Sequence, residues 1–223
     1  PMSAWTFDDD NWSEASYSDY PYLTWEENVN SVADLEAISS GDLTARYRMG
    51  SNIDLTGVNF NSYIIGTSSS AAFSGTFNGN GYTISNLTIN VPSTNYVGLF
   101  GCTSSAAILT NVVLTNVSVT GRTYVGGLAG YNYGVISNSS CSTGIVTTAD
   151  DDFGYNIGGL VGLNVGTVID CYATTNVGSS NSADIGGLVG YNRHGTIADS
   201  YATGAVAGFS YVGGLVGSSD WGV

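Results

Sequence analysis

The chain has 223 residues, a formal net charge of -14 and a hydrophobic content of 43%. Its basic side chains are four arginines, too few to neutralise a phosphate backbone, so the composition argues against a nucleic-acid partner. No apolar run approaches the ~20 residues of a membrane span, so no membrane insertion is expected. The 31 glycines accompany enough apolar and aromatic residues to build a packed core, unlike a disordered tract.

Residues 1–30 are predicted to form an acidic, aromatic-rich N-terminal arm that lies on the body of the protein. The chain begins at Pro1, which we interpret as a sign that an export leader has been removed. The runs Asp8–Asp10 and Asp150–Asp152 are typical of solvated acidic segments, with a cation site as the alternative. Neither run has the alternating oxygen ligands and final Glu that a calcium loop requires.

A short capping helix is predicted within residues 31–45. Ser31 is a good N-cap, Asp34 falls in the first turn, and Gly41 ends the helical pattern. The helix would cover the open hydrophobic end of a first coil through one apolar face, made of Val32, Leu35 and Ile38.

From residue 46 to 223 the pattern changes to short strands separated by turns. The segment from Tyr47 to Leu55 is predicted as the first strand, and Tyr82 to Ile89 alternates as a strand should. Between them, Asn78-Gly-Asn-Gly81 is a turn suited to positive φ.

One heptapeptide recurs through this region. Tyr124-Val-Gly-Gly-Leu-Ala-Gly130 is followed by close copies at 156–162, 184–190 and 211–217, and a shorter version occupies 96–101. The first glycines stand at positions 98, 126, 158, 186 and 213, so the spacings are 28, 32, 28 and 27 residues. A period in this range is the signature of a stacked repeat. The sequence therefore predicts an all-β fold, a right-handed parallel β-helix (β-solenoid) of about five to six coils.

The repeat assigns a structural role to each of its positions. Paired glycines are expected at a corner of each coil, where they would allow positive φ and close approach: Gly126, Gly127, Gly158, Gly159, Gly186, Gly187, Gly213 and Gly214. An aliphatic core column would consist of Leu128, Leu160, Leu188 and Leu215. A second column would consist of Ile136, Val168 and Ile197. A ladder of amide hydrogen bonds would run through Asn132, Asn164 and Asn192.

These motifs resemble the GLUG motif, a Gly-Leu-(small/apolar)-Gly repeat of exported bacterial and archaeal surface proteins. The segment from Tyr47 to Asn90, which contains Asn52-Ile-Asp-Leu55 and Phe73 to Gly81, looks like the β-strand segment that usually precedes such repeats. The resemblance covers roughly residues 30–217. It implies a β-helix in an adhesin, or beside the catalytic part of an IgA-specific zinc peptidase. It implies an extracellular or cell-surface location but no activity, because these repeats are the non-catalytic part.

The sequence offers little for catalysis, and no catalytic, metal or cofactor site is predicted. A zinc peptidase helix needs two histidines, whereas the chain has only His194, which falls in a turn. Asp170 and Asp199 could lie one above the other like the carboxylates of a sugar-cleaving β-helix. Because Asn138 occupies the same column, a polar corner ladder is the preferred interpretation.

Cysteines and sequons leave alternatives open. Cys141 and Cys171 should lie about 8 Å apart, beyond bridging distance, so the three cysteines are either buried thiols or partners in disulfides between subunits. The third is Cys102. Four Asn-x-Ser/Thr sequons would accept N-glycans on an exported chain: Asn11, Asn86, Asn116 and Asn138.

The last repeat, from Tyr211 to Gly217, is expected to leave an uncapped coil with free strand edges. The leading hypothesis is therefore a non-catalytic, exported structural protein that associates with itself into a surface layer, sheath or fibre. The alternative is an adhesin stalk or binding module, whose ligand would be a host glycan or protein. A polysaccharide-active enzyme is the third hypothesis.

Overall fold

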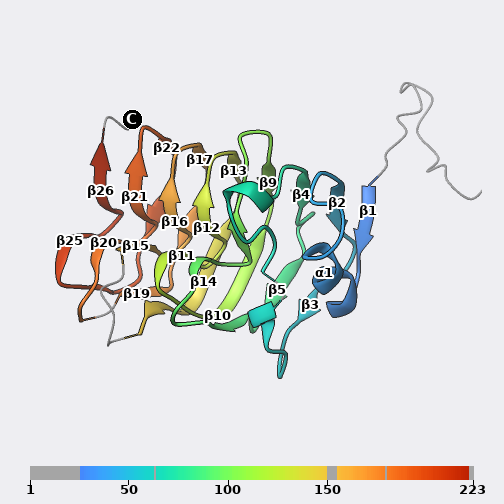
Figure 1. The fold of residues 1–223 in the computed structure, drawn as a ribbon, viewed down its shortest axis with the longest axis horizontal. Helices are drawn as coiled ribbons and strands as arrows, with labels where there is room; N and C mark the ends of the chain where they lie inside the picture. The colour runs from blue at the N-terminus through green and yellow to red at the C-terminus, as the bar shows by residue number, and fades with distance from the viewer. Residues whose placement is uncertain (1–25, 63, 150–154, 179, 221–223) are drawn as a thin grey trace, which may run out of the picture.

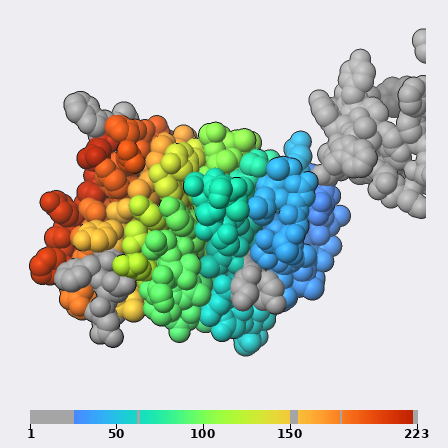
Figure 2. All heavy atoms as spheres, viewed as in Figure 1, coloured from blue at the N-terminus to red at the C-terminus, as the bar shows by residue number. Residues whose placement is uncertain are grey.

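A computed structural model describes residues 26–62, 64–149, 155–178 and 180–220. These residues form a β-solenoid of about six turns, in which every strand pairs in parallel with the same part of the next turn (Figure 1). Successive turns appear as neighbouring bands from blue to red along the molecule (Figure 2). The predicted parallel β-helix is confirmed.

Four sheets form the walls of the solenoid. The seven-stranded sheet contains, in order, β1 (Glu26–Val29), β2 (Arg46–Met49), β4 (Thr76–Asn78), β9 (Ile108–Thr110), β13 (Val135–Ser137), β17 (Thr167–Ile169) and β22 (Thr196–Ala198).

The nine-stranded sheet is wider, because its strands in the middle coils continue around a bend. It contains β3 (Ile53–Asp54), β5 (Thr83–Ser85), β6 (Thr88–Asn90), β10 (Val113–Gly121), β14 (Ser140–Thr148), β18 (Tyr172–Ala173), β19 (Asn176–Gly178), β23 (Tyr201–Ala202) and β24 (Val206–Ala207).

The repeated heptapeptide links the two remaining sheets. The β11 sheet contains β7 (Asn95–Val97), β11 (Thr123–Gly126), β15 (Tyr155–Gly158), β20 (Ala183–Gly186) and β25 (Ser210–Gly213). The β12 sheet contains β8 (Phe100–Cys102), β12 (Ala129–Asn132), β16 (Val161–Asn164), β21 (Val189–Arg193) and β26 (Val216–Asp220).

From β4 onward, each described coil passes through the four sheets in the same order. In one coil the strands are β9, β10, β11 and β12, and β13 to β16 repeat the path one rung further along. The register is strict: Val125 pairs with Ile157, which pairs with Ile185, which pairs with Val212. Equivalent side chains therefore stack in columns, and the columns build one continuous core.

The core changes character along the axis. Near the N-terminus it is filled by rings, with centroids 5.1 Å apart for Phe73 and Phe100 and 5.4 Å apart for Phe77 and Phe100. In the later coils it is filled by aliphatic columns. The predicted column of Ile136, Val168 and Ile197 is confirmed by their register.

The N-terminal end of the solenoid is covered by α1 (Val32–Ile38). The Ser31 side chain accepts a hydrogen bond from the backbone N–H of Asp34, as the N-cap prediction requires. Leu35 and Ile38 are fully buried, and Val32 packs against the same core. The predicted short capping helix is therefore present, and it ends at Ile38, before the predicted stop at Gly41.

The predicted boundaries of the N-terminal part were wrong in two respects. The β-helix begins at β1, within the predicted 1–30 arm, because Glu26–Val29 pairs with Arg46–Met49. The predicted strand from Tyr47 to Leu55 is two strands, β2 and β3, which lie in different sheets with a bend between them. The remainder of the arm, residues 1–25, lies outside the described residues, as do Asp8–Asp10 and Asp150–Asp152.

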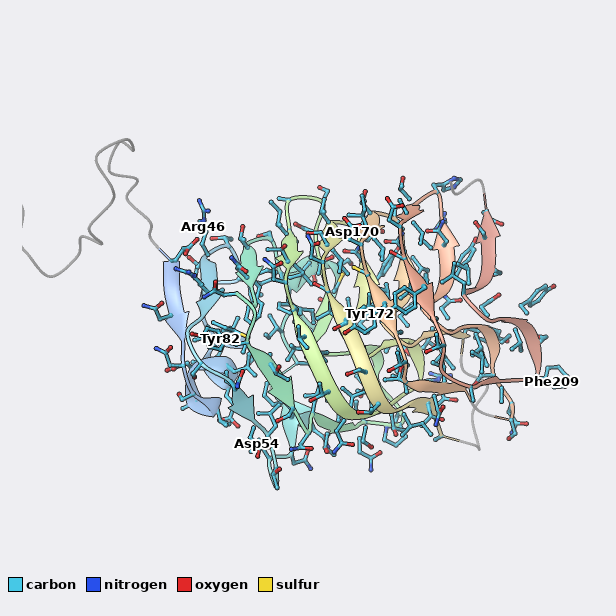
Figure 3. The ribbon with its side chains drawn as sticks, turned by 180° about the vertical axis from the view of Figure 1, so that it is seen from behind. Arg46, Asp54, Tyr82, Asp170, Tyr172 and Phe209 are labelled. Carbon is cyan, nitrogen blue, oxygen red and sulfur yellow. The ribbon has the colours of Figure 1, made fainter. Side chains whose placement is uncertain are left out.

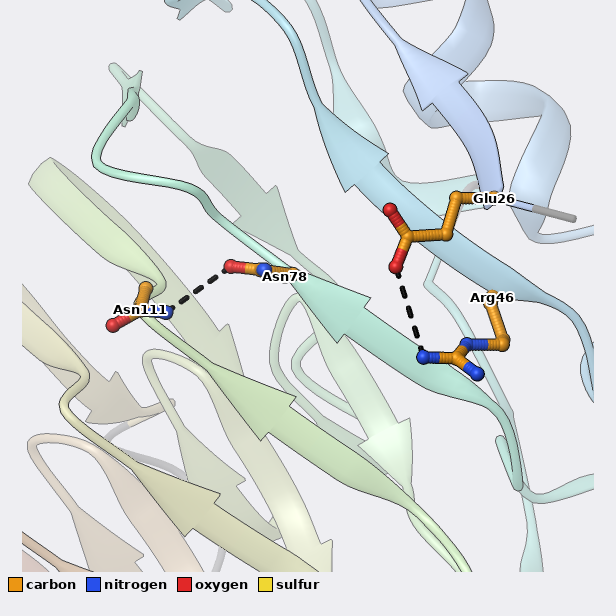
Figure 4. A network of polar contacts seen from close by, with 4 residues as sticks. All are labelled: Glu26, Arg46, Asn78 and Asn111. Atoms are coloured by element: carbon orange, nitrogen blue, oxygen red, sulfur yellow. Dashed lines mark hydrogen bonds and ion pairs between the residues drawn. The ribbon is translucent and has the colours of Figure 1, made fainter. Parts of the chain in front are cut away.

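Two short 3-10 helices, η2 (Phe60–Ser62) and η3 (Ser69–Ala71), belong to the long connection from β3 to β4. Polar contacts also join neighbouring strands of the seven-stranded sheet and the turns that follow them (Figure 4). Arg46 lies 3.7 Å from Glu26, and the Asn111 side chain donates a 3.2 Å hydrogen bond to that of Asn78. The ion pair is partly exposed and contributes little to stability.

Candidate functional site

The most organised feature of the molecule is the heptapeptide itself, where the β11 and β12 sheets meet. We call this line of contacts the glycine seam, defined by Gly126, Gly158 and Gly186 on one side and Gly130, Gly162 and Gly190 on the other. A Cβ on Gly126 would lie 2.2 Å from the carbonyl oxygen of Ala129, and one on Gly158 would lie 2.0 Å from that of Val161. Backbone atoms fill this space, so no side chain fits between the two sheets.

The structure corrects the reason for which glycine was expected here. None of the eight predicted corner glycines has positive φ, although Gly127 and Leu128 do form the bend between β11 and β12. The left-handed positions belong to the residue two places before the first glycine: Tyr96, Tyr124, Asn156, Asp184 and Tyr211, with φ between 50° and 62°. The heptapeptide thus needs glycine for close approach of two backbones and not for backbone conformation.

Two further columns of left-handed residues turn the other corners. Asn111, Asn138, Asp170 and Asp199 follow strands of the seven-stranded sheet, and Asn86, Asn116 and Thr143 lie at the bend of the nine-stranded sheet. Asn and Asp tolerate this conformation better than other residues with a side chain. The corner with Asn138, Asp170 and Asp199 was predicted from the sequence. The recurrence of Asn86, Asn116 and Thr143 about one repeat apart is the signal that could have located the other.

The position of Asp170 and Asp199 bears on the enzyme hypothesis. Both occupy the corner column that also holds Asn138, as the polar-ladder interpretation predicts. His194 is exposed in a left-handed turn, and its backbone N–H bonds to the carbonyl of Asp220. Within the described residues, no three His, Cys, Asp or Glu side chains are grouped as metal ligands would be.

The predicted Asn ladder is a chain of buried amide hydrogen bonds. Asn132 donates to the side-chain oxygen of Asn164 over 2.8 Å, and Asn164 donates to that of Asn192 over 2.9 Å. The ladder begins one rung earlier than expected, because the Thr103 hydroxyl donates to Asn132 over 2.8 Å. Each amide also bonds the carbonyl of the turn that follows it, so these buried groups satisfy one another.

The predicted leucine column lies on the core side of the glycine seam. The backbone N–H of Leu128 bonds to the carbonyl of Leu160, whose N–H bonds to that of Leu188, whose N–H bonds to that of Leu215. Leu128, Leu160 and Leu188 are fully buried, whereas Leu215 in the last described coil is 37% exposed.

A second hydrophobic cluster lies on the other side of the seam, in the column that the sequence predicts for Cys102, Tyr131 and Leu163. Its buried members are Cys102, Tyr131 and Leu163. The Tyr96, Tyr124 and Tyr131 rings stack with centroids 5.0 to 6.0 Å apart, and the Tyr131 and Tyr133 hydroxyls lie 2.7 Å apart. We call these residues the outer aromatic cluster. Burial and the hydrogen bond with Tyr133 raise the pKa of Tyr131, so this buried hydroxyl stays protonated near pH 7.

All three cysteines are buried, free thiols. Cys141 pairs in register with Ala173, which puts it two positions from Cys171, as predicted. Burial raises the pKa of Cys102 to about 11, that of Cys141 to about 12 and that of Cys171 to about 11. Protonated, buried thiols are poor nucleophiles. The arrangement matches the buried-thiol interpretation and makes disulfides between subunits dependent on local opening.

Three of the four predicted sequons are described: Asn86 and Asn138 follow strands, and Asn116 lies at the bend within β10. Asn11 lies outside the described residues. The Asn86 side chain donates to Asp54 over 2.7 Å, and the Asn116 side chain donates to Asn86 over 2.6 Å. Asn138 lies in the corner column with Asp170. Asn86 and Asn116 therefore already have a structural role in holding neighbouring coils together.

The fold and the seam define a class: a β-solenoid whose repeats are matched backbone to backbone by glycine. Comparison with known protein families identifies the type of repeat. The family described as "The GLUG motif" matches residues 153–178 and 181–207. The chain carries GLUG repeats, as its sequence predicts.

This chain is similar to parts of three longer proteins. "Halomucin" of Haloquadratum walsbyi is 38% identical over 137 residues, which is 60% of this chain but 1% of that protein. A "Putative Gly-rich membrane protein" of Evansella cellulosilytica is 44% identical over 75 residues, 32% of this chain and 9% of that protein. The crystal structure of "a putative immunoglobulin A1 protease" from Bacteroides ovatus superposes with a TM-score of 0.68 at 21% identity. That superposition covers 87% of this chain and 66% of the other, and it supports the fold alone. In the described part of this chain no helix is long and apolar enough to cross a bilayer.

Proposed function

We propose that this chain is a non-catalytic structural segment of an exported surface protein. Its coils would extend or associate by stacking edge to edge. The observation that carries the proposal is the strict register of the four walls, in which every coil presents to the next the same backbone edge and the same columns. Similarity to a halomucin and to a Gly-rich membrane protein supports a surface location.

The edge available for stacking is that of the last described coil, β22 to β26. Val212 is 44% exposed and Leu215 is 37% exposed, whereas Ile185 and Leu188, one rung earlier, are fully buried. An exposed parallel edge with apolar columns is a template for another strand. In a longer protein a further coil would cover it, and in solutions of this chain a second copy would do so.

A matched pair of substitutions tests this proposal. Leu215→Asp places a charge in the stacking edge, while Val135→Asp places the same charge on the seven-stranded sheet, where Val135 is 38% exposed. Sedimentation velocity with electron microscopy should show concentration-dependent assembly of the parent chain and of Val135→Asp, with and without reductant, and its loss in Leu215→Asp. A parent chain that stays monomeric at high concentration would rule out self-association.

The second candidate is the stalk of a larger adhesin, in which the edge is covered by the same polypeptide. The repeats of this chain cover only small fractions of the two matched relatives, which favours a place inside longer proteins. Appending one further coil, copied from residues 183–209, after residue 220 distinguishes the two. If the stalk is correct, the extended chain should be more stable and equally monomeric.

A further inference from the structure

The charges of this acidic protein avoid one broad face. Among the described residues, no strand of the nine-stranded sheet from β5 to β24 contains a carboxylate or a basic side chain. Charged residues flank these strands: Asp54 lies on the edge strand β3 and Asp170 in the corner before β18 (Figure 3). Arg122 directly follows the end of β10. In a chain of net charge -14, this sheet is therefore a neutral surface.

Hydroxyl groups occupy one outward-facing column of this sheet on five successive coils. The pairing of Ser85 with Thr115 and of Thr115 with Ser142 sets the column, and it continues through the residues that follow the paired Ala173 and Ala202. We call this column the hydroxyl row, made of Ser85, Thr115, Ser142, Thr174 and Thr203. At about 4.8 Å per rung it is about 19 Å long and runs along the solenoid axis.

An aromatic pair borders the hydroxyl row. Tyr172 and Tyr201 lie two residues before Thr174 and Thr203, on the same face of the sheet. Their ring centroids are 5.2 Å apart and their planes differ by 6°, so they form a regular wall beside the row. Tyr201 is 53% exposed. A tyrosine ring offers an apolar body together with a hydroxyl at its tip.

We propose that this face binds an uncharged polysaccharide, laid along the hydroxyl row with its sugar rings against Tyr172 and Tyr201. A polyhydroxylated neutral chain matches rows of hydroxyls that can both donate and accept hydrogen bonds. An acidic polysaccharide is repelled by the net charge, and the described strands from β5 to β24 carry no cationic side chain that would offset this repulsion. A second copy of the protein fits less well, because stable interfaces between like chains have an apolar centre and this one is lined by hydroxyls.

The interaction is tested with the whole chain by affinity electrophoresis through gels that contain hydroxyethyl cellulose, galactomannan or glycogen, with polygalacturonate as the acidic comparison. Retardation by at least one neutral polymer and by no acidic polymer is the expected result. Equal retardation by both kinds, or by none of the neutral polymers, would overturn the proposal.

Two serines of one coil provide a matched pair of variants. Ser142→Asp charges the hydroxyl row, and Ser137→Asp makes the same change on the seven-stranded sheet; both serines are half-buried and each makes one hydrogen bond. Ser142→Asp should abolish retardation while Ser137→Asp leaves it unchanged. Circular dichroism and thermal melting confirm that both variants fold.

A milder variant, Thr115→Val, keeps the site testable if Ser142→Asp fails to fold. Thr115→Val keeps the shape of the side chain and removes one hydroxyl, so it should weaken binding about three- to tenfold. Unchanged affinity in both Thr115→Val and Ser142→Asp would refute the site. A dimer of the parent chain that Ser142→Asp dissociates would show instead that the face joins two copies.

Discussion

The two ends of the solenoid reach the same fold by different means. Up to β8 the core depends on individual large side chains, the connection from β3 to β4 is long, and α1 closes the end. From β9 to β21 each coil has nearly the same path, an aliphatic core, the glycine seam and one member of the Asn ladder. The N-terminal coils are thus held by unique packing, and the repeat coils by register and backbone proximity.

The largest loss of stability is expected in the repeat coils, at the second glycine of the heptapeptide, where two backbones approach closely. A Cβ on Gly159 would lie 2.3 Å from the Gly187 carbonyl oxygen, whereas one on Gly214, at the same repeat position, has nothing within 4 Å. Gly159→Ala should therefore cost more than about 5 kcal/mol, enough to prevent folding. Gly214→Ala should change the free energy of unfolding by less than about 0.5 kcal/mol in urea titrations. Equal effects would mean that close approach of neighbouring coils does not require glycine at the second glycine position of the heptapeptide.

The N-terminal core should respond to loss of a ring. Phe100 is fully buried between Phe73 and Phe77, so Phe100→Ala should lower the free energy of unfolding by about 3–5 kcal/mol. Hydrogen exchange should show the loss of protection centred on β4 and β8, with β20 and β21 protected for longer. Uniform loss of protection would show that the two ends unfold as one cooperative unit.

Removing one amide of the Asn ladder should lower the free energy of unfolding by an intermediate amount. Asn164→Ala removes a group that both accepts from Asn132 and donates to Asn192, so two buried amides each lose one hydrogen bond. The expected loss is about 2–4 kcal/mol in chemical denaturation. Asn192→Ser is the milder control, because Ser219 already occupies this column in the next coil. If Asn164→Ala lowered the free energy of unfolding by less than Asn192→Ser does, the ladder hydrogen bonds of Asn164 would not contribute to stability as proposed.

One substitution should strengthen the repeat half. The Thr175 hydroxyl is fully buried and has no hydrogen-bond partner among the described residues. Thr175→Val keeps the volume and removes the unsatisfied group, so it should raise stability by about 1 kcal/mol. Thermal melting against Thr174→Val, whose parent hydroxyl accepts a bond from the Thr143 N–H, provides the comparison. Destabilisation by Thr175→Val would reveal a partner for that hydroxyl.

The smallest expected effect concerns pH and is confined to the N-terminal half. Hydrogen bonds from Asn86 and Thr56 hold the pKa of Asp54 below its usual 3.8, and those from Asn30 and Ser31 lower the pKa of Asp34. A lowered folded-state pKa stabilises the fold above pH ~4, and this contribution is lost as pH falls through the folded value. NMR titration should show turns around Asp54 loosening first in acid. The variant Asp54→Asn should remove that local change.

The sequence by itself determined the solenoid, its repeat length and its columns. A column needs only periodicity: once a 27- to 32-residue period is stacked at one rung per coil, Leu128 must lie over Leu160 and Asn132 over Asn164. The capping helix could also be predicted, because the N-cap Ser31 and the apolar spacing of Leu35 and Ile38 are local features of the sequence.

Only the tertiary structure decided the role of the repeat glycines and which residues of neighbouring coils come into contact. Local reasoning expects glycine where φ is positive, yet the left-handed residues are Tyr124, Asn156 and Asp184, and the glycines are dictated by backbones from other strands. Strand β1 was missed because its four residues gain their place only by pairing with β2. The outer aromatic cluster and the neutral hydroxyl face arise in the same way. Residues about 30 positions apart become neighbours only after the coils have stacked, and a single coil contains no sign of that contact.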